Sequence, residues 1–357
     1  MTKTRLNSGV IKRILIRSTN WVGDAMLTTP AVRAVRKNFP EAQISILAKP
    51  WVSPIFYNNP YVDHVMRYDS EGKHAGWLGK ARLIKELRRG RFDLSVLFQN
   101  AFEAALLTYL AGIPNRLGYD TDARGALLTH SIGLEPKLKQ IHEIDYYLAI
   151  LQGAFLEPDG RGLTLILTDQ ERSRAEDILS NCDITGEEIL VGVNPGSTYG
   201  LAKRWPPERY AALCDKIQNT WAARIVIFGG SGEEATGRQI SALMKHRCVN
   251  LCGKTTLREA VALIEKCQLF VTNDSGLMHV ASALDVPLVA IFGSTNPTTT
   301  GPIGLRNRII RVPVPCSPCL KTECPEDHRC MKEITVDTVY AAADALIAET
   351  SKGGDSR

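Results

Sequence analysis

The 357-residue sequence lacks an uninterrupted apolar segment long enough to cross a membrane, which takes about 20 residues in a helix. The nearest approach, residues 95–113, is interrupted by Gln99, Asn100 and Glu103. The basic start is followed by a short apolar run at residues 14–16, which is too short for the core of a signal peptide. From these absences we expect a cytoplasmic protein.

The cysteines also lack the pattern of a secreted, disulfide-bonded domain. There are nine, an odd number, and five are scattered through apparent core elements. The other four crowd one loop at C-x2-C-x4-C-x5-C: Cys316, Cys319, Cys324 and Cys330. Only one C-x2-C unit is present, whereas paired units are the stronger signature of zinc. A structural zinc site, reduced thiols and a redox-sensitive loop are all left open by this spacing.

The sequence has no strong excess of one charge. It contains 43 Lys and Arg against 38 Asp and Glu, a net charge of +5, and 44% of its residues are hydrophobic, as in ordinary globular proteins. The mild positive excess suits an anionic substrate but does not indicate nucleic-acid binding. A basic run at residues 80–91 predicts a solvated helix face, which could also contact anionic lipid headgroups.

The chain is too long for one ordinary α/β domain, and strands alternate with helices in both halves. The first half predicts strands at 13–17, 44–47 and 94–98 and helices at 25–38, 80–89 and 143–155. The second half predicts strands at 189–193, 225–228, 269–271 and 288–292 and helices at 169–180, 207–220 and 336–350. We therefore expect an α/β protein with two parallel-sheet domains, residues 1–168 and 169–335, facing one cleft, followed by a C-terminal helix and tail at 336–357.

A turn of polar residues follows the strand at 269–271, and a helical pattern begins directly after it. Such turns lie at the carboxyl ends of parallel strands, where these sheets bind ligands. The free N–H groups and positive dipole end of the helix suit a phosphate. The residues expected to line this mouth are Asp274, Ser275, Gly276 and His279. The alternative is that Asp274 or Ser275 caps the helix and His279 only packs.

A second group of polar residues, Ser197, Thr198 and Lys203, follows the strand at 189–193. Two hydroxyl groups and an ammonium group at a strand end could neutralise a diphosphate. This group predicts that the second half binds a phosphorylated ligand.

In the first half, Asp24 lies on the loop after the strand at 13–17. A carboxylate near a helix N-terminus is favoured in its charged form, so Asp24 is a candidate general base. The alternative is a helix cap. Asp120 and Asp122 have the spacing of a carboxylate pair that could hold Mg²⁺, but their polar turn favours a solvated loop.

Taken together, the blocks at 17–24, 194–206 and 273–279 resemble the bacterial ADP-heptose:lipopolysaccharide heptosyltransferases of glycosyltransferase family 9. Within that family, the chain is most similar to the heptosyltransferase II group, which adds the second heptose of the inner core. The resemblance runs from Ile14 to the final helix, and the cysteine-rich loop also looks like that of heptosyltransferase II proteins.

This resemblance implies a GT-B fold with two Rossmann-like domains, and an inverting sugar transfer that needs neither a metal nor a cofactor. It implies ADP-heptose as the donor and, as the acceptor, lipid A–Kdo–heptose at the inner-membrane surface, where the protein could make peripheral contact. It also implies that the C-terminal helix packs back on the first domain.

The family's catalytic aspartate falls on Asp24. Its donor-phosphate residues fall on Ser197, Thr198 and Lys203. Its donor-binding turn falls on Asp274, Ser275, Gly276, Leu277 and His279. Since the acceptor is anionic, three residues in loops of the first domain are candidates for its recognition: Arg116, Arg124 and His142.

Three other interpretations are weighed against this one. A heptosyltransferase could act on another inner-core acceptor, and a non-catalytic sugar-nucleotide binding protein would keep the donor loops without needing Asp24. A nicotinamide-dependent dehydrogenase should show G-x-G-x-x-G after its first strand. The residues that follow the strand at 13–17 are instead Ser-Thr-Asn-Trp-Val-Gly-Asp, which argues against the dehydrogenase.

Overall fold

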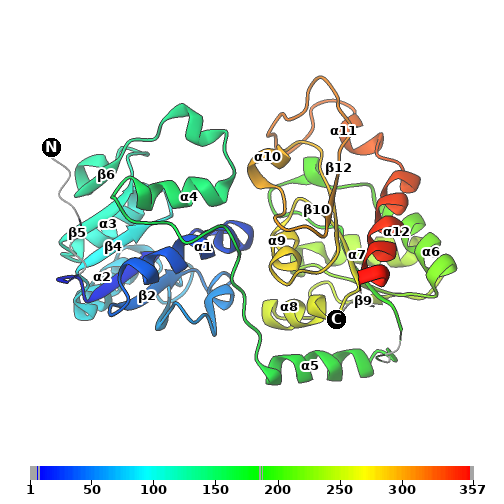
Figure 1. Ribbon diagram of the computed structural model, residues 1–357, viewed down its shortest axis with the longest axis horizontal. Helices are drawn as coiled ribbons and strands as arrows, with labels where there is room; N and C mark the ends of the chain where they lie inside the picture. Colours follow the sequence, from blue (N-terminus) through cyan, green and yellow to red (C-terminus); the bar gives the residue numbers. More distant parts are fainter. Residues whose placement is uncertain (1–5, 7–8, 185, 187, 354–357) are drawn as a thin grey trace. The chain divides into compact units, whose positions relative to one another are not determined.

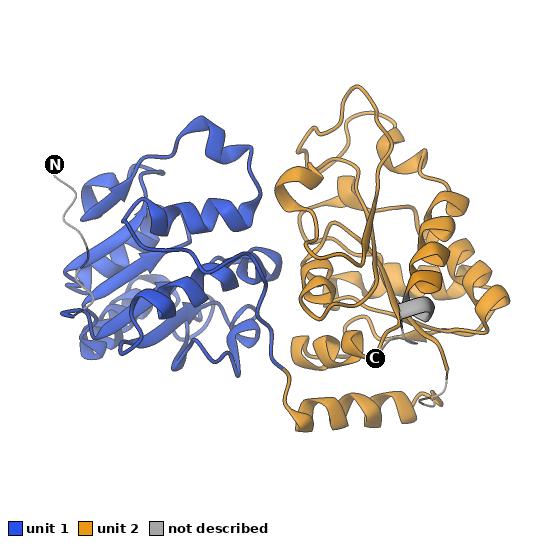
Figure 2. Ribbon diagram, in the orientation of Figure 1, with its two compact units in different colours: residues 1–166 blue, residues 167–357 orange. Residues whose placement is uncertain are grey.

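The computed structural model describes residues 6, 9–184, 186 and 188–353. The chain divides into two compact units, Met1–Ile166 and Leu167–Arg357 (Figure 2). The boundary lies two residues before the predicted one. Each unit has its own parallel sheet and its own core.

The first unit is built on a six-stranded parallel sheet in the order β3-β2-β1-β4-β5-β6. Its strands are β1 (Arg13–Arg17), β2 (Gln43–Ala48), β3 (His64–Arg67), β4 (Leu94–Leu97), β5 (Asn115–Tyr119) and β6 (His130–Ile132). Its helices are α1 (Val22–Asn38), α2 (Gly76–Gly90), α3 (Phe102–Leu110) and α4 (Glu143–Gln152), with short 3-10 helices at Ser53–Phe56, Gly125–Leu127 and Pro136–Lys139. The central strands are largely apolar, and all their residues except Arg13 are buried, as expected when helices cover both faces of a parallel sheet.

The second unit repeats this plan, in the order β12-β11-β10-β7-β8-β9. Its strands are β7 (Leu190–Asn194), β8 (Arg224–Ile227), β9 (Val249–Asn250), β10 (Leu269–Asn273), β11 (Leu288–Ile291) and β12 (Asn307–Ile310). Its helices are α5 (Asp169–Ser180), α6 (Pro207–Trp221), α7 (Glu234–Leu243), α8 (Leu257–Glu265), α9 (Gly276–Ala283), α10 (Pro297–Thr300), α11 (Arg329–Lys332) and α12 (Val336–Gly353), with 3-10 turns at Leu201–Lys203 and Ser231–Glu233. In Figure 1, α8 and α9 lie on one side of this sheet and α6 and α12 on the other.

Both sheets reverse their strand order next to their first strand. In the first unit β1 lies between β2 and β4, and in the second β7 lies between β10 and β8. Such a reversal leaves a crevice at the carboxyl ends of the two diverging strands, where doubly wound sheets bind ligands. The loops after β1, β7 and β10 are therefore the ones that the topology places at binding positions.

The final helix α12 belongs to the second unit. Its buried residues Val339, Ala343 and Leu346 share one hydrophobic core with strands of the second sheet. It contacts α6, β11 and β12. The helix thus covers one face of its own sheet.

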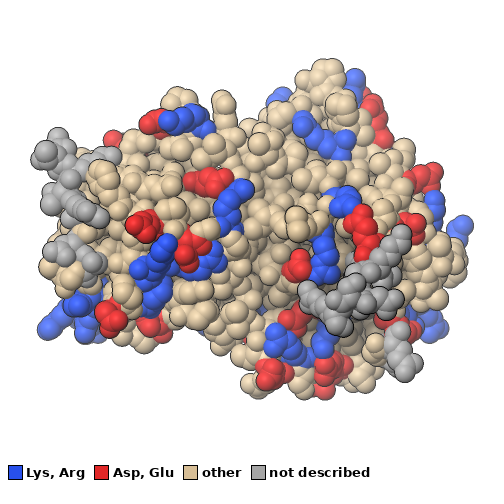
Figure 3. Space-filling model, viewed as in Figure 1, with Lys and Arg blue, Asp and Glu red and all other residues tan. Residues whose placement is uncertain are grey.

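Two surface features complete the description. No helix in the described part of the chain is long and apolar enough to span a membrane. Figure 3 shows charged side chains of both signs interspersed over the visible face, without a broad area of one sign.

Candidate functional site

In the second unit, two asparagines join the strand ends at the reversal point. Asn194, the last residue of β7, accepts hydrogen bonds at Oδ1 from Ser275 Oγ (2.7 Å) and Thr272 Oγ1 (3.2 Å). Asn273, the last residue of β10, donates from Nδ2 to the Pro195 carbonyl oxygen at 2.7 Å. Each strand end therefore holds the loop that follows the other strand, which fixes the crevice between β7 and β10.

Asp274 lies at the centre of this crevice. Its Oδ2 is 2.6 Å from Lys203 Nζ and accepts a hydrogen bond from Thr295 Oγ1 at 2.7 Å. The side chains of Lys203 and Asp274 are only 12% and 5% exposed. The carboxylate thus joins the loops after β7, β10 and β11, and it holds one ammonium group at the carboxyl edge of the sheet. We call Lys203, Asp274 and Thr295 the Asp274 cluster.

The other predicted donor residues of the second unit's first loop, Ser197 and Thr198, lie on the same β7 loop as Lys203. Ser197 is buried, and its carbonyl oxygen accepts a hydrogen bond from the Arg204 guanidinium at 3.1 Å. Thr198 is exposed. Lys203 Nζ also lies 4.7 Å from the centre of the Tyr199 ring, close enough for a cation–π contact. The loop therefore presents Lys203 and Thr198 near the same edge.

The predicted turn after β10 leads directly into α9, which begins at Gly276. Ser275 occupies the N-cap position but makes no side-chain capping bond to the helix, because its hydroxyl is bonded to Asn194. Ser275, Gly276 and Leu277 are half-buried, whereas His279 is only 4% exposed. The turn thus presents the helix N-terminus, and His279 packs inward.

In the first unit, Asp24 lies in the first turn of α1 and not before the helix as predicted, because α1 begins at Val22. The N-cap residue, Trp21, makes no side-chain cap. Asp24 is half-buried. Its charge acts on Tyr147, whose pKa is raised well above its usual range, first by burial and next by Asp24. A carboxylate at the positive end of a helix is favoured in its ionised form, the form that a general base needs.

The three predicted acceptor residues have structural partners in this unit. Arg124 is fully buried and donates to the carbonyl oxygens of Tyr119 and Gln99 and to Asn100 Oδ1. Burial lowers its pKa to about 10. This placement does not present its guanidinium group to a ligand, and it fixes the loop after β4.

Arg116 and His142 are also engaged. The Arg116 guanidinium donates to the Leu127 carbonyl oxygen at 2.5 Å and to that of Ile113. His142 is the N-cap of α4, where its Nδ1 accepts from the Ile144 N–H at 3.2 Å. The structure does not gather the three acceptor candidates into one cluster of free cations.

Two groups of residues have the spacing of a metal site, the pair Asp120 and Asp122 and the four cysteines of one loop. Asp122 accepts a hydrogen bond at 2.6 Å from the N–H of Phe102, the first residue of α3. Burial raises the pKa of Cys330 to about 11, with smaller contributions from the other three cysteines of its loop. All nine cysteines are free thiols. Within the described residues, no three His, Cys, Asp or Glu side chains are grouped to hold a metal ion.

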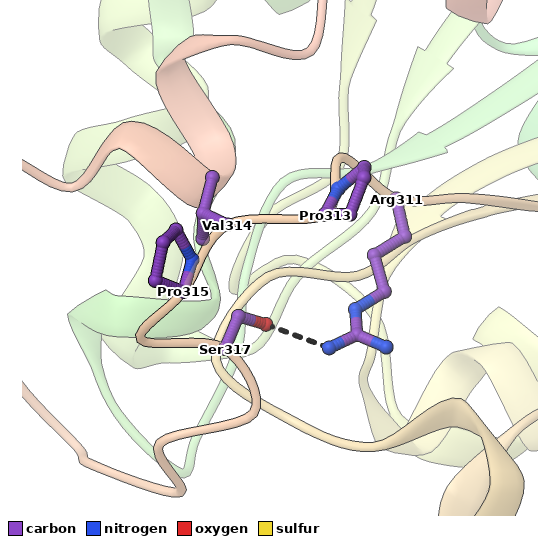
Figure 4. Close-up of a pocket in the computed structure, with 5 residues that line it drawn as sticks. All are labelled: Arg311, Pro313, Val314, Pro315 and Ser317. Atoms are coloured by element: carbon purple, nitrogen blue, oxygen red, sulfur yellow. Dashed lines mark hydrogen bonds between the residues drawn. The ribbon is translucent and has the colours of Figure 1, made fainter.

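An open cavity of about 500 Å³ lies after β12, lined by Arg311, Pro313, Val314, Pro315 and Ser317 (Figure 4). Arg311 Nη2 donates to Ser317 Oγ at 3.0 Å. None of these residues belongs to the loops after β7 and β10. We place the candidate site at the Asp274 cluster, because charge, burial and topology converge there.

Sequence reasoning missed Thr295 and the bridging role of Asn194. Both follow the signal that identified the other site residues, a polar side chain at or just after the end of a parallel strand. Thr295 comes four residues after β11, beyond the short turn of Phe292, Gly293 and Ser294. The spacing could have identified it.

Comparisons with known proteins identify the family of this chain. The family model described as glycosyltransferase family 9 (heptosyltransferase) matches residues 80–329. The lipopolysaccharide heptosyltransferase 2 of Salmonella typhimurium is 32% identical over 347 residues, with 94% of this chain and 99% of that protein covered.

Two solved structures show the same architecture. The Escherichia coli ADP-heptose lps heptosyltransferase II has a TM-score of 0.81 at 29% identity, covering 95% of this chain and 99% of that one. A glycosyl transferase family 9 protein from Veillonella parvula has a TM-score of 0.88 at 25% identity, covering 98% and 100%. The predicted GT-B fold class, two parallel sheets with flanking helices, is confirmed.

The Asp274 cluster predicts a specific cost for removing its cation. In Lys203→Met the Asp274 carboxylate stays buried without its ammonium partner, which should lower the free energy of unfolding of the second unit by about 3 kcal/mol. Asp274→Asn in the same chain should restore part of that loss. Urea unfolding measures both.

A matched control is Lys216→Met, which removes a lysine whose partner, Asp337, is 84% exposed. Exposed pairs contribute about 0–1 kcal/mol, so this variant should remain close to the wild type. Equal stability of Lys203→Met and Lys216→Met would contradict the importance of the buried pair.

Proposed function

The chain belongs to glycosyltransferase family 9, and from that premise we propose that it transfers L-glycero-D-manno-heptose from ADP-heptose to the first heptose of the lipopolysaccharide inner core. The observation that carries the donor half of this proposal is the Asp274 cluster at the strand reversal of the second unit. The acceptor half is supported by relatives named heptosyltransferase 2, which match nearly the whole chain.

For the donor, Lys203 is the group that meets the diphosphate. Its ammonium group is held 2.6 Å from Asp274, so it is already positioned when the ligand arrives. The N-terminus of α9 adds N–H groups and a positive dipole end at the same edge. Ser197 and Thr198 supply hydroxyl groups from the neighbouring loop. Together these groups stabilise the negative charge that develops on the departing ADP.

For the transfer step, Asp24 acts as the general base. Its carboxylate takes the proton of an acceptor heptose hydroxyl while that oxygen attacks the anomeric carbon of the donor heptose. The bond from the anomeric carbon to the ADP phosphate oxygen breaks, and positive charge builds on the sugar as in other glycosyl transfers. A single displacement of this kind inverts the anomeric centre. Lys203 and the α9 N-terminus replace a metal ion in this proposal.

For the acceptor, the placement of Arg124 favours a positioning role in which it holds the Gln99–Asn100 loop through its buried hydrogen bonds. Arg116 and His142 support the loops at Leu127 and at the start of α4 in the same way. We propose that these residues shape the acceptor side of the first unit.

The test of the proposed function is an assay with ADP-heptose and two defined core acceptors, one carrying a single heptose and one carrying none. Mass spectrometry should detect one added heptose only on the single-heptose acceptor, and activity should persist in EDTA. Transfer to the heptose-free acceptor would instead indicate a different inner-core step. Donor binding without any transfer would indicate a non-catalytic binding protein.

Loss of activity in EDTA that Mg²⁺ restores would point to Asp120 and Asp122, and loss that only Zn²⁺ restores would implicate the cysteine loop.

Removing the proposed base should affect the chemical step alone. Asp24→Asn should reduce turnover by about 10²–10⁴-fold, the range typical of a lost general base, and leave ADP affinity unchanged. Asp120→Asn, an exposed carboxylate of the same unit, is the matched control and should retain wild-type turnover. Steady-state rates that are equal in the two variants would remove Asp24 from this role.

A lipid-linked acceptor also calls for contact with a membrane surface, and α2 has the features for it. Trp77 and Leu78 at its start are 79% and 85% exposed, and basic residues including Lys85 and Arg89 follow on exposed positions. Apolar side chains beside a basic face favour binding to anionic lipid. Vesicles with anionic lipid should co-sediment the wild type more strongly than a Trp77→Ser, Leu78→Ser variant, and equal binding would contradict this contact.

A further inference from the structure

Two cations and a tyrosine lie at the carboxyl edge of the first sheet, at the ends of three neighbouring strands. Arg17 is the last residue of β1, Lys49 follows β2 and Tyr68 follows β3. The ladder continues past the strand ends, since Tyr68 N donates to the Ala48 carbonyl oxygen at 2.7 Å. The three residues therefore lie side by side. We call them the Arg17 cluster.

Both cations of this cluster contact one aromatic ring. The guanidinium carbon of Arg17 is 5.4 Å from the centre of the Tyr68 ring, and Lys49 Nζ is 4.1 Å from it. The exposed fractions of Arg17, Lys49 and Tyr68 are 3%, 8% and 1%. Two positive charges are thus held together in a largely dry environment.

Neither cation is neutralised by an acid. Arg17 donates to the carbonyl oxygens of Ser18 and Leu47 and to Asn20 Oδ1, and Lys49 donates to Ser70 Oγ, all of them neutral acceptors. Among the described carboxylates, none forms an ion pair with either residue. Of these, Glu103 accepts a hydrogen bond from the Tyr68 hydroxyl at 3.1 Å and is paired with Lys80 at 2.6 Å. Its charge acts on both cations, and that of Glu71 acts on Lys49, but neither carboxylate bonds to Arg17 or Lys49.

The electrostatic consequence is that burial disfavours the charged form of both cations. Burial lowers the pKa of Arg17 to about 10, and burial together with the charge of Arg17 lowers the pKa of Lys49. Burying cations without a counter-charge costs free energy that a bound anion would recover. The hydroxyls of Ser18 and Thr19, directly after Arg17, are buried and make no hydrogen bond to any described group, so they are available as further donors.

We propose that Arg17 and Lys49 bind an oxyanion, a carboxylate or a phosphate group, at this edge of the first unit. The segment from Ser18 to Trp21 connects the cluster to α1, whose first turn carries Asp24. Trp51 holds this segment, since its Nε1 donates to the Asn20 carbonyl oxygen at 2.9 Å and its ring lies 5.9 Å from Lys49 Nζ. An oxyanion bound here would be positioned by the same loop that positions Asp24.

The oxyanion has two possible sources. One is the acceptor, whose core carries carboxylates and often phosphates, an assignment that rests on the proposed function. The other is free phosphate. The contrasting explanation is that Arg17 and Lys49 only pack against Tyr68 and stabilise the fold.

The first experiment measures melting temperature with inorganic phosphate, against potassium chloride at equal ionic strength. At a phosphate concentration ten times its dissociation constant, the transition of the first unit should rise by about 3 °C. Lys49→Met should abolish this rise and should melt no earlier than the wild type in phosphate-free buffer, because a buried charge has been removed. Lys37→Met, a lysine of α1 whose side chain is 46% exposed, is the control and should keep the rise.

A wild type that gains nothing from phosphate, or a Lys49→Met variant that keeps the full rise, overturns the proposal. A Lys49→Met variant that melts early in phosphate-free buffer and responds to phosphate like the wild type establishes the packing role instead. Neither readout depends on sugar transfer, so failure of the proposed function would leave this test intact.

The second experiment separates the two sources with steady-state kinetics. If the site takes an acceptor oxyanion, Lys49→Met should raise the acceptor KM by about 10-fold, the scale of one lost charge-assisted hydrogen bond, and leave the donor KM unchanged. Phosphate should then compete with the acceptor in the wild type and not in Lys49→Met. An unchanged acceptor KM, with the phosphate-dependent rise retained in the wild type, assigns the site to free phosphate.

Discussion

The buried ion pair between Asp274 and Lys203 is the interaction on which the second unit's binding edge depends. A carboxylate with 5% of its side chain exposed is stable only because an ammonium group and the Thr295 hydroxyl satisfy it. The Asp274 carboxylate also fixes the three loops that follow β7, β10 and β11, because its partners Lys203 and Thr295 lie on two of them. The same pair holds a cation at the point where the sheet topology opens a crevice, so the requirement that stabilises the fold also prepares the site for an anion.

The sequence predicted the α/β class and the repeated strand–helix plan, because buried parallel strands are short apolar runs. Elements without such runs escaped it. The strand β9 is only two residues long, and β12 is half-exposed and begins with Asn307. The apolar stripe of α12 identified a helix but not its partner, since a stripe does not say which sheet it covers. In the structure, Leu346 of α12 shares one hydrophobic core with Trp205 of the second unit.

The candidate site was predictable where polar residues follow strands, as with Lys203, Asp274 and Ser275, which the structure brings to the same edge of the sheet. It was not predictable where function depends on burial. The sequence places Arg124 on a loop, yet its buried guanidinium group donates hydrogen bonds to backbone carbonyl oxygens inside the unit. Conversely, Arg17 and Lys49 look like ordinary strand-end residues, and only the distances to Tyr68 reveal two buried cations without an acid. Charge balance across strands is a property of the fold and not of local spacing.

The central claim is that Lys203, held by Asp274, recognises the phosphates of the donor. Calorimetric titration of the wild type and of Lys203→Met with ADP and with adenosine tests it most directly, with Lys216→Met as the control for charge. The account predicts that Lys203→Met loses at least about 10-fold in ADP affinity, the scale of a lost charge-assisted hydrogen bond, while adenosine binds as before. Equal loss of affinity for both ligands, or no loss for ADP, would contradict it.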